Sequence, residues 1–302
     1  MKRIIARLYA PLFWGGFIAL GLGVVQAGFS ALWLLPLFLA ALAVSFVTEW
    51  VLPYEASWNR AAGDRVRDML HALVNETLNA VGLLALPGLV ALLSFDGVWP
   101  NQWPLWLQLA LAIFIADAGI SLMHYASHRV HGLWRLHAVH HSVERLYGFN
   151  GLMKHPLHQL LEATAGLLPL LVLGIPLEVA TLLAFAIAIQ LLLQHSNVDM
   201  QLGPLRHVFA WAPVHRFHHM KYGRAGDVNF GLFFNLWDRL LGTAFYTTDY
   251  SIRHGDLGIG SRPDFPRDYL AQLRDPFAAA TLSKEPSVPE PLRRRVNPAS
   301  AN

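Results

Sequence analysis

Histidine is the residue whose type and spacing most directly indicate chemistry in this sequence. The stretch His124–His141 holds six histidines in eighteen residues and follows a long apolar run. Separations of three and four residues recur, and on a helix both place side chains on one face. Imidazoles that converge from such faces are good ligands for iron, zinc, copper and nickel. Eight histidines follow these separations: His124, His128, His137, His140, His141, His215, His218 and His219.

The number of these histidines indicates two metal ions rather than one. Eight imidazoles exceed the ligands that a single ion accepts, and without metal they would repel one another whenever protonated, whereas bound metal keeps them neutral. The glutamate-based pattern of soluble di-iron bundles does not occur here. A solvated, pH-sensitive histidine face is the alternative use of such a pattern.

Long apolar segments must position these histidines. Of the 302 residues, 54% are hydrophobic and 14% are charged, whereas a typical soluble domain has about 25% charged residues. A helix that spans a bilayer needs roughly 20 apolar residues. We therefore predict an all-α, polytopic membrane helix bundle of about six spans with a cytoplasmic, histidine-rich helical cap. The apolar runs are Leu8–Gly28, Phe29–Val47, Leu78–Phe95, Leu105–Met123, Ala163–Ile175 and Val179–Gln194.

The same pattern divides the chain into three parts. Residues 1–115 are predicted to be N-terminal transmembrane helices. Residues 116–250 are predicted to be the histidine-box catalytic region, with a transmembrane hairpin at about 157–196. Residues 251–302 are predicted to be a cytoplasmic C-terminal segment, disordered from about residue 284 because its end is rich in Pro, Ser and Arg.

Basic residues predict the orientation in the membrane. All 23 Lys and Arg lie before the first apolar run, between the second and third, between the fourth and fifth, or after the last. The positive-inside rule then places both termini and the metal site in the cytoplasm. The compact chain favours a bacterial inner membrane.

Other broad classes are excluded by composition. The chain has no Cys, which excludes disulfides and iron–sulfur ligation by cysteine. No basic and aromatic pattern indicates a nucleic-acid partner. The first apolar run lacks an Ala-x-Ala site and leads directly into a second span, so we do not expect a cleaved signal peptide.

Asp117 is the one charged residue in the run Leu105–Met123. It precedes His124 by seven residues, which places it two helical turns deeper on the same face. An ionisable residue within a membrane span is a functional-site candidate by default. A hydrogen bond to another helix, through Asn75 or Asn79, is the structural alternative.

The histidine groups and the segments around them resemble the fatty acid hydroxylase/sterol desaturase superfamily of integral-membrane, non-haem di-iron enzymes. The resemblance runs from about Asp117 to Tyr246, nearly half of the chain. Histidine boxes in this order and spacing are highly specific for the superfamily and much less specific for the substrate. The matching segments are Asp117 with His124-x-x-x-His128, LWRLHAVHHS (Leu133–Ser142), KHPLHQLLE (Lys154–Glu162), QHSNVDM (Gln194–Met200), PVHRFHH (Pro213–His219), DVNFG (Asp227–Gly231) and LWDRLLGT (Leu236–Thr243).

The resemblance implies a ligand set around two iron ions. It implies that the eight histidines above bind metal and that His195 adds a ninth ligand. His155 is a possible ligand, and so is Asp199, which stands where some relatives have another histidine. Residues expected to orient imidazoles are Asp117, Asn197, Asp227 and Asn229. Histidines without a matching ligand position are His71, His131, His158, His207 and His254.

The resemblance also implies the reaction. A di-iron centre of this superfamily uses O2 to hydroxylate or desaturate a lipid, here a fatty acyl or sterol-like substrate. Electrons must come from an external reductase, ferredoxin or cytochrome-type donor, since the chain has no haem domain, flavin fingerprint or cysteine cluster.

Three other functions remain as alternatives. A zinc-dependent membrane hydrolase or isomerase would need fewer ligands, because zinc commonly takes four. A haem-binding electron carrier would need paired histidines at membrane depth. A metal transporter would need polar residues along a path through the bilayer.

Overall fold

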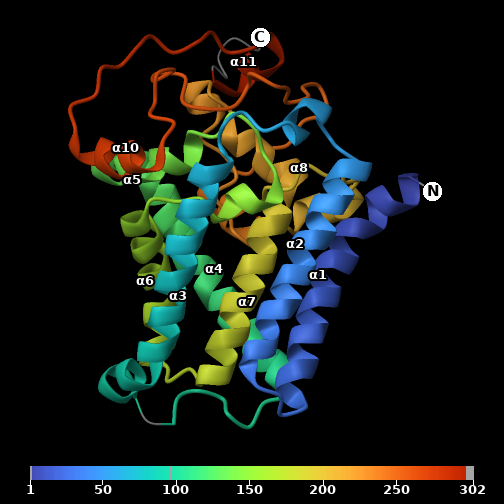
Figure 1. The fold of residues 1–302 in the computed structure, drawn as a ribbon, viewed down its shortest axis with the longest axis vertical. Coiled ribbons are helices and arrows are strands. Elements are labelled where there is room, and N and C mark those ends of the chain that lie inside the picture. The colour runs from blue at the N-terminus through green and yellow to red at the C-terminus, as the bar shows by residue number, and fades with distance from the viewer. Residues whose placement is uncertain (1, 96, 297–302) are drawn as a thin grey trace.

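The computed structural model describes residues 2–95 and 97–296, and the regular elements in this part of the chain are all helices (Figure 1). The α-helices are α1 (Lys2–Gln26), α2 (Leu34–Val51), α3 (Arg65–Leu93), α4 (Leu105–Arg129), α5 (His131–His141), α6 (Pro156–Val172), α7 (Leu177–Gln194), α8 (Ala212–His215), α9 (Leu236–Leu241), α10 (Tyr269–Arg274) and α11 (Glu290–Val296). The 3-10 turns are η1 (Ala31–Trp33), η2 (Ala56–Asn59), η3 (Gly148–Leu152), η4 (Gly203–His207), η5 (Arg216–His219), η6 (Gly223–Ala225) and η7 (Asp275–Phe277). The predicted all-α architecture is confirmed.

Within the described residues, five helices are long and apolar enough to cross a membrane. They are α1, η1 with α2, α3, α4 and α7. The sequence predicts about six spans or embedded helices, and α6 is the sixth, with only 17 residues. Pro169 lies in its last turns, and Gly174 follows it with a φ of 80°. Proline removes a helical hydrogen bond and glycine accepts the left-handed conformation, so α6 ends early.

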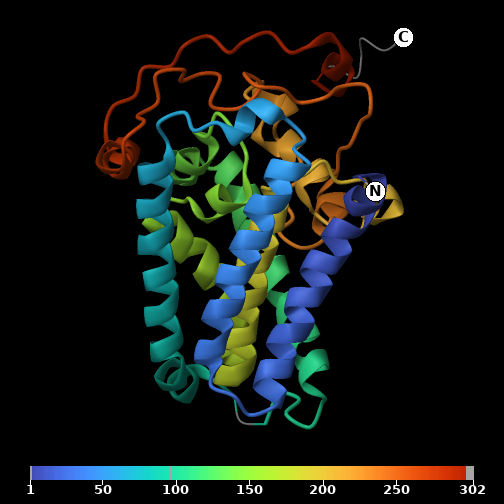
Figure 2. The same ribbon diagram turned by 45° about the vertical axis from the view of Figure 1, so that its right-hand side comes forward.

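The long helices run side by side, and the cap lies at one end of them (Figures 1 and 2). α1 begins at the cap, whereas α4 and α7 end there. α7 is the central helix, because 72% of its apolar window is buried, compared with 6% for α3. The ends of α4 and α7 thus deliver side chains from the middle of the bundle to the base of the cap.

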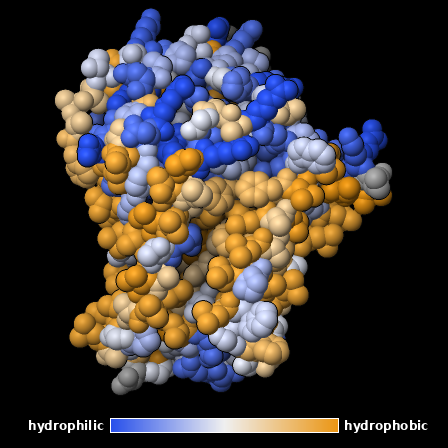
Figure 3. Space-filling view, in the orientation of Figure 1, coloured by the Kyte–Doolittle hydropathy of each residue, from blue (hydrophilic) through white to orange (hydrophobic). Residues whose placement is uncertain are grey.

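The surface divides into zones of different polarity. On the face shown in Figure 3, a broad hydrophobic band covers the helices and hydrophilic side chains cover the cap. The connections at the other end, residues 27–33, 94–104 and 173–176, contain no Lys or Arg. This is the charge asymmetry that the positive-inside rule describes.

Two predicted boundaries meet particular elements of the fold. The division at residues 115 and 116 falls inside α4, so the histidine-box region begins within a continuous helix. In the segment predicted to be disordered from about residue 284, α11 forms and Leu292 is buried. Residues 297–302 of that segment lie outside the described residues.

α4 and α6 pack closely because glycine lies at their contact. A Cβ atom added at Gly119 would lie 2.0 Å from the carbonyl oxygen of Ala165 on α6. Small residues at such positions let the backbones of membrane helices approach each other. Since α4 carries two histidines of the first box, this contact also fixes the site.

We predict that Gly119→Ala destabilises the protein although alanine favours helices. The added methyl group must push α6 away, and overpacking of this kind costs about 1–3 kcal/mol. Thermal unfolding in detergent should show a lower midpoint. The matched control is Gly88→Ala on α3, where an added Cβ meets no atom within 4 Å. An equal effect of the two substitutions would contradict the packing role.

Candidate metal centre

α4 and α5 together supply five histidines to one buried region. His124 and His128 occupy the last two turns of α4, and α5 carries the His137, His140 and His141 group. Val130 is extended between the two helices, with a φ of −104°, and turns the chain so that α5 faces back toward α4. All five imidazoles are therefore directed into the base of the cap.

The remaining four histidines come from the end of α7 and from two short turns. His195 is the C-cap of α7, and His215, His218 and His219 lie in α8 and η5. Arg216, within this box, donates hydrogen bonds of 2.7 Å to the carbonyl oxygens of Ser196 and Val198. This buried guanidinium ties the third box to the chain that follows α7.

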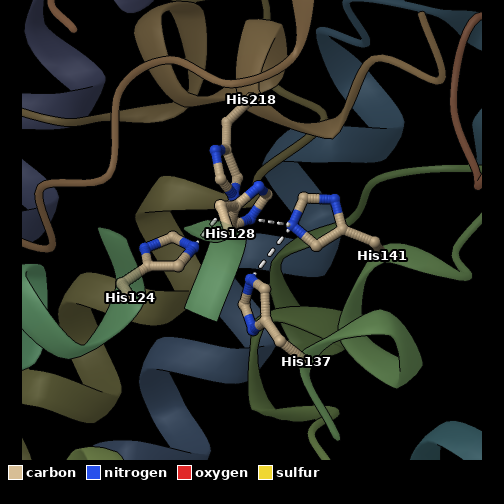
Figure 4. Close-up of side chains that lie close together, drawn as sticks. All are labelled: His124, His128, His137, His141 and His218. Atoms are coloured by element: carbon tan, nitrogen blue, oxygen red, sulfur yellow. Dashed lines mark hydrogen bonds between the residues drawn. The ribbon is translucent and has the colours of Figure 1, made fainter. Parts of the chain in front are cut away.

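The nine histidines form two groups, and within each group the ligand atoms lie within 4.8 Å of one another. In Figure 4 the imidazoles of the first group point toward a common centre. The first group is His124, His128, His137, His141 and His218; the second is His140, His195, His215 and His219. The structure therefore brings together all nine histidines named from the sequence, divided between two neighbouring sites.

Hydrogen bonds show that each group has the chemistry of a cation site. In the first group, His124 Nδ1 donates to the carbonyl of Phe230 and His218 Nδ1 donates to that of Val228, each at 2.8 Å. A neutral imidazole has a hydrogen on only one of its two nitrogens. Since Nδ1 carries it in both rings, both Nε2 atoms hold bare lone pairs. These two atoms lie 2.9 Å apart. Two facing lone pairs repel each other unless a cation binds both.

The second group repeats this arrangement. His140 Nδ1 donates to the carbonyl of Met153 at 2.9 Å, and His195 Nδ1 donates to that of Leu191 at 3.1 Å. Their Nε2 atoms lie 3.1 Å apart. Histidines that bind metal characteristically donate the other ring N–H to a carbonyl or carboxylate. The donor sets of both groups therefore fit a transition-metal ion.

Protonation is a poor substitute for metal in this region. Burial lowers the pKa of His195 to about 3. Burial, followed by the neighbouring imidazoles, lowers the pKa of His141 and His215 well below the ordinary value. These groups are therefore neutral at physiological pH, which is the form that binds metal.

A loop at residues 228–234 holds the orienting carbonyls in place. Asn229 adopts a φ of 55° and donates to the carbonyls of Val214 and Phe245, each at 2.8 Å. Asp238 accepts from the backbone N–H of Phe230 at 2.7 Å. Neither of these Asn229 hydrogen bonds involves an imidazole, but its neighbours Phe230 and Val228 supply the acceptors for His124 and His218, so the role predicted for Asn229 would act through the backbone.

Asp117 binds the same loop from inside the bundle. Its carboxylate accepts from the N–H of Phe233 at 2.7 Å, that of Phe234 at 3.2 Å and Trp237 Nε1 at 2.8 Å. The hydrogen-bond alternative considered from the sequence has this form, but its partner is the loop rather than Asn75 or Asn79. Asp117 does not lie in either histidine group.

Asp227 and Asn197 lie in different environments. Asp227 Oδ1 accepts from His128 Nδ1 at 3.0 Å, as expected for a residue that orients a ligand. Asn197 instead donates to Glu55 O at 3.0 Å and to Asn59 Oδ1 at 2.8 Å. Asn197 therefore holds η2 against the end of α7. Neither of these two hydrogen bonds involves an imidazole.

The two possible extra ligands lie outside both groups. His155 caps α6: its Nδ1 accepts from Leu157 N at 3.1 Å, and its Nε2 donates to Leu273 O at 3.2 Å. Asp199 is exposed. His131, His207 and His254 are exposed, whereas His71 is buried and bonds Gln272 at 2.9 Å.

Sequence reasoning missed a polar group beside the histidines. His158 and Glu162 form a third set of close ligand atoms with His137, and Lys154 is paired with Glu162. His158 is fully buried, with Nε2 at 2.9 Å from Ser127 Oγ. The four-residue separation of His158 and Glu162 within KHPLHQLLE was the available signal.

Comparison with known proteins identifies the family of this chain. Residues 109–243 match the family described as fatty acid hydroxylase. The chain is 34% identical to an ornithine lipid hydroxylase of Rhizobium tropici over 90% of this chain and 86% of that protein. This chain belongs to the fatty acid hydroxylase family. No solved structure gives a significant match.

More distant relatives extend the comparison. The human alkylglycerol monooxygenase is 26% identical over 69% of this chain and 46% of that protein. The zebrafish enzyme of the same name (Danio rerio) is 28% identical over 52% of this chain and 34% of that protein. The chain thus spans less than half the length of these two relatives. Family membership confirms the predicted integral-membrane oxidoreductase acting on lipids, and the histidine groups are compatible with a metal site.

We predict that the purified chain binds two metal ions and that each group loses its ion separately. His218→Ala removes a ligand from the first group and His219→Ala removes one from the second, so each variant should retain about one ion per chain. Elemental analysis after removal of loose metal measures this ratio. The control is His207→Ala, an exposed histidine outside both groups. Full metal content in either ligand variant would contradict the assignment.

We also predict that Asp227→Ala weakens metal binding in the first group. Loss of the acceptor frees the ring of His128, and removal of such a partner typically lowers metal affinity roughly 10–100-fold. Competition with a chelator measures the affinity of each ion. Asp199→Ala, an exposed carboxylate, is the control. The role is wrong if the two variants retain metal equally.

Proposed function

We propose that this protein is a di-iron monooxygenase that uses O2 to hydroxylate a membrane lipid. The proposal rests on two buried histidine groups. In each group, two imidazole Nε2 atoms with bare lone pairs face each other. Iron held there would supply the oxidising power to break an unactivated C–H bond. The first group offers five imidazoles, more than the four ligands that zinc commonly takes, which favours iron.

The chain's own residues provide the surroundings that this chemistry requires. Eight of the nine imidazoles are at most 7% exposed as whole residues, and the His128 side chain is 4% exposed. Water is therefore largely excluded from the cage, which protects a reactive centre from side reactions. Backbone carbonyls hold the rings of His124, His218, His140 and His195, and Asp227 holds that of His128, so these five rings need little reorganisation when metal binds.

The lipid would bind in a cavity beside the cage, which we call the lateral cavity. It lies between α3, α4, α6 and α7 and has a volume of about 360 Å³. Leu78, Leu160 and Leu168 line it and are also 43–58% exposed on the apolar surface. A lipid could thus enter from the bilayer between α3 and α6 without crossing water.

Electrons would arrive from the opposite side of the cage. A polar hollow of about 350 Å³ in the cap is lined by His128, His141 and Trp134 together with Lys221 and Arg224. The ring centroids of Trp134 and His128 are 4.9 Å apart. If an external reductase, ferredoxin or cytochrome-type donor docked over this hollow, only the side chain of Trp134 would separate it from His128 of the first group.

We assign the cap to the cytoplasm and the bundle to a bacterial inner membrane. The loops at the end away from the cap contain no Lys or Arg, and the first turns of α1 at the cap contain Lys2, Arg3 and Arg7. This distribution favours a cytoplasmic cap under the positive-inside rule. Reduced donors of the cytoplasm would then reach the polar hollow directly.

Ornithine lipid is the first substrate to test, since the relative that aligns over 90% of this chain is named for it. The full chain should be expressed in a bacterial host that makes ornithine lipid and in one that makes only phospholipids. Mass spectrometry of total lipids should show a species with one added oxygen in the first host. His140→Ala should abolish it. A wild-type chain that holds two irons but yields no oxidised lipid in either host would overturn the proposed function.

The lateral cavity itself can be tested at Gly82. This glycine lines the cavity on α3, and an added Cβ meets no atom within 4 Å. Gly82→Leu should fill the cavity and lower lipid oxidation at least tenfold, while α3 gains about 1 kcal/mol of helix propensity. The control is Gly88→Leu, outside the cavity on the same helix. Unchanged oxidation in Gly82→Leu would place the lipid elsewhere.

A further inference from the structure

The lateral cavity has two ends of different chemistry. At the end toward the cap it is lined by Lys154 and Glu162, with Gln159 and Asn79 close by. Gln159 Nε2 donates to Asn79 Oδ1 at 3.2 Å, so these four side chains make two polar pairs. Toward the other end the walls are hydrocarbon, formed by Leu89, Leu167, Leu171, Ala180 and Leu183.

The polar end adjoins the histidine cage. Lys154 and Glu162 also line a small space of about 10 Å³ together with His124, His137 and His195. A Glu162 carboxylate oxygen lies within 4.8 Å of ring nitrogens of both His137 and His158. Any chemical group bound to this ion pair would therefore lie close in space to ligands of both histidine groups, His137 in the first and His195 in the second.

The ion pair between Lys154 and Glu162 is not explained by stability. The two side chains are 9% and 5% exposed. Desolvation of a buried pair often costs more than its attraction returns, and apolar replacements of similar volume are often neutral or stabilising. A lysine ammonium has three donors and a carboxylate has about four acceptor positions, so the pair retains capacity for further hydrogen bonds.

The cage closes the cavity on the cap side. The space that Lys154 and Glu162 share with His124, His137 and His140 has a volume of only about 10 Å³, so a chain that enters from the bilayer cannot pass beyond these histidines. A lipid whose middle carbons faced the cage would have to bend back within the cavity. It would also place methylene groups against the ion pair, which would leave the free hydrogen-bond positions of Lys154 and Glu162 unpaired.

We propose that Lys154 and Glu162, with Gln159 at the mouth, bind the polar head end of the lipid substrate and select the carbon that is oxidised. The acyl chain then extends away from the cage, toward Leu89 and Leu171. The added oxygen belongs to the head group or to the first carbons beside it, and not to the middle of an acyl chain. This inference rests on the proposed function, because it assumes that the lateral cavity holds the lipid.

Tandem mass spectrometry of the oxidised lipid from cells that express the full chain tests the position directly. Fragments should place the new oxygen on the head group or within the first carbons of a chain attached to it. An oxygen or a double bond at mid-chain would overturn this inference and leave the proposed function standing. No oxidised lipid from a wild-type chain with two irons would overturn both.

Substitutions separate binding of the head end from a structural role. The double variant Lys154→Met with Glu162→Gln removes both charges at similar volume, and it should lower the yield of the head-proximal product at least tenfold with iron content unchanged. Gln159→Leu, which leaves the ion pair intact, should raise the lipid concentration for half-maximal activity several-fold in nanodiscs and leave the maximal rate unchanged.

Leu157→Ala provides the matched control, since Leu157 is on the same helix, is 45% exposed and does not line the cavity. It should leave product position and yield unchanged. Loss of iron in the double variant would show that the pair supports the cage instead of the lipid. That result, or an unchanged product in both cavity variants, would overturn the proposal.

Discussion

The contact between pairs of hydrogen-free imidazole nitrogens is the constraint on which the rest of the structure depends. His124 and His218 face each other at 2.9 Å, and His140 and His195 face each other at 3.1 Å, with every opposite ring nitrogen bound to a backbone carbonyl. Such contacts are repulsive without a shared cation. The fold must therefore be rigid enough to hold the rings together against this repulsion. Bound metal then stabilises the arrangement, because the facing lone pairs become its ligands.

That rigidity comes from connecting the cap to α4 at two levels. α4 carries His124 at its end and Asp117 two turns deeper. Asp117 fixes the backbone of Phe233, and the same loop presents the Phe230 carbonyl to His124. One membrane helix thus holds both a ligand and, through the loop, the acceptor that orients this ligand. A rotation of α4 would move the two together, so the ring keeps its direction.

The sequence predicts the parts of this arrangement that arise from local periodicity. Helical separations place His137, His140 and His141 on one face, and apolar length gives the spans. Contacts that depend on where distant backbones meet could not be predicted. Asn197 bonds Glu55 and Asn59 across more than 130 residues, and Asp117 accepts from Phe233 N across 116 residues. The length of α6 also depends on local residues, because Pro169 lies in its last turn and Gly174, with a φ of 80°, follows its end.

The cage also forms a wall between two compartments of opposite polarity. On one side is the lateral cavity, with hydrocarbon walls and a mouth on the apolar surface. On the other is the polar hollow of the cap, lined by His128 and His141 with Lys221 and Arg224. Under the proposed function, a lipid and a water-soluble donor would approach the same histidines from opposite sides without meeting. Exclusion of water from the lipid side would protect the oxidising chemistry that iron held by these histidines would supply. Lys154 and Glu162 line the lateral cavity and also the small space beside His124, His137 and His195, so this ion pair is the polar feature that a lipid in the cavity would meet.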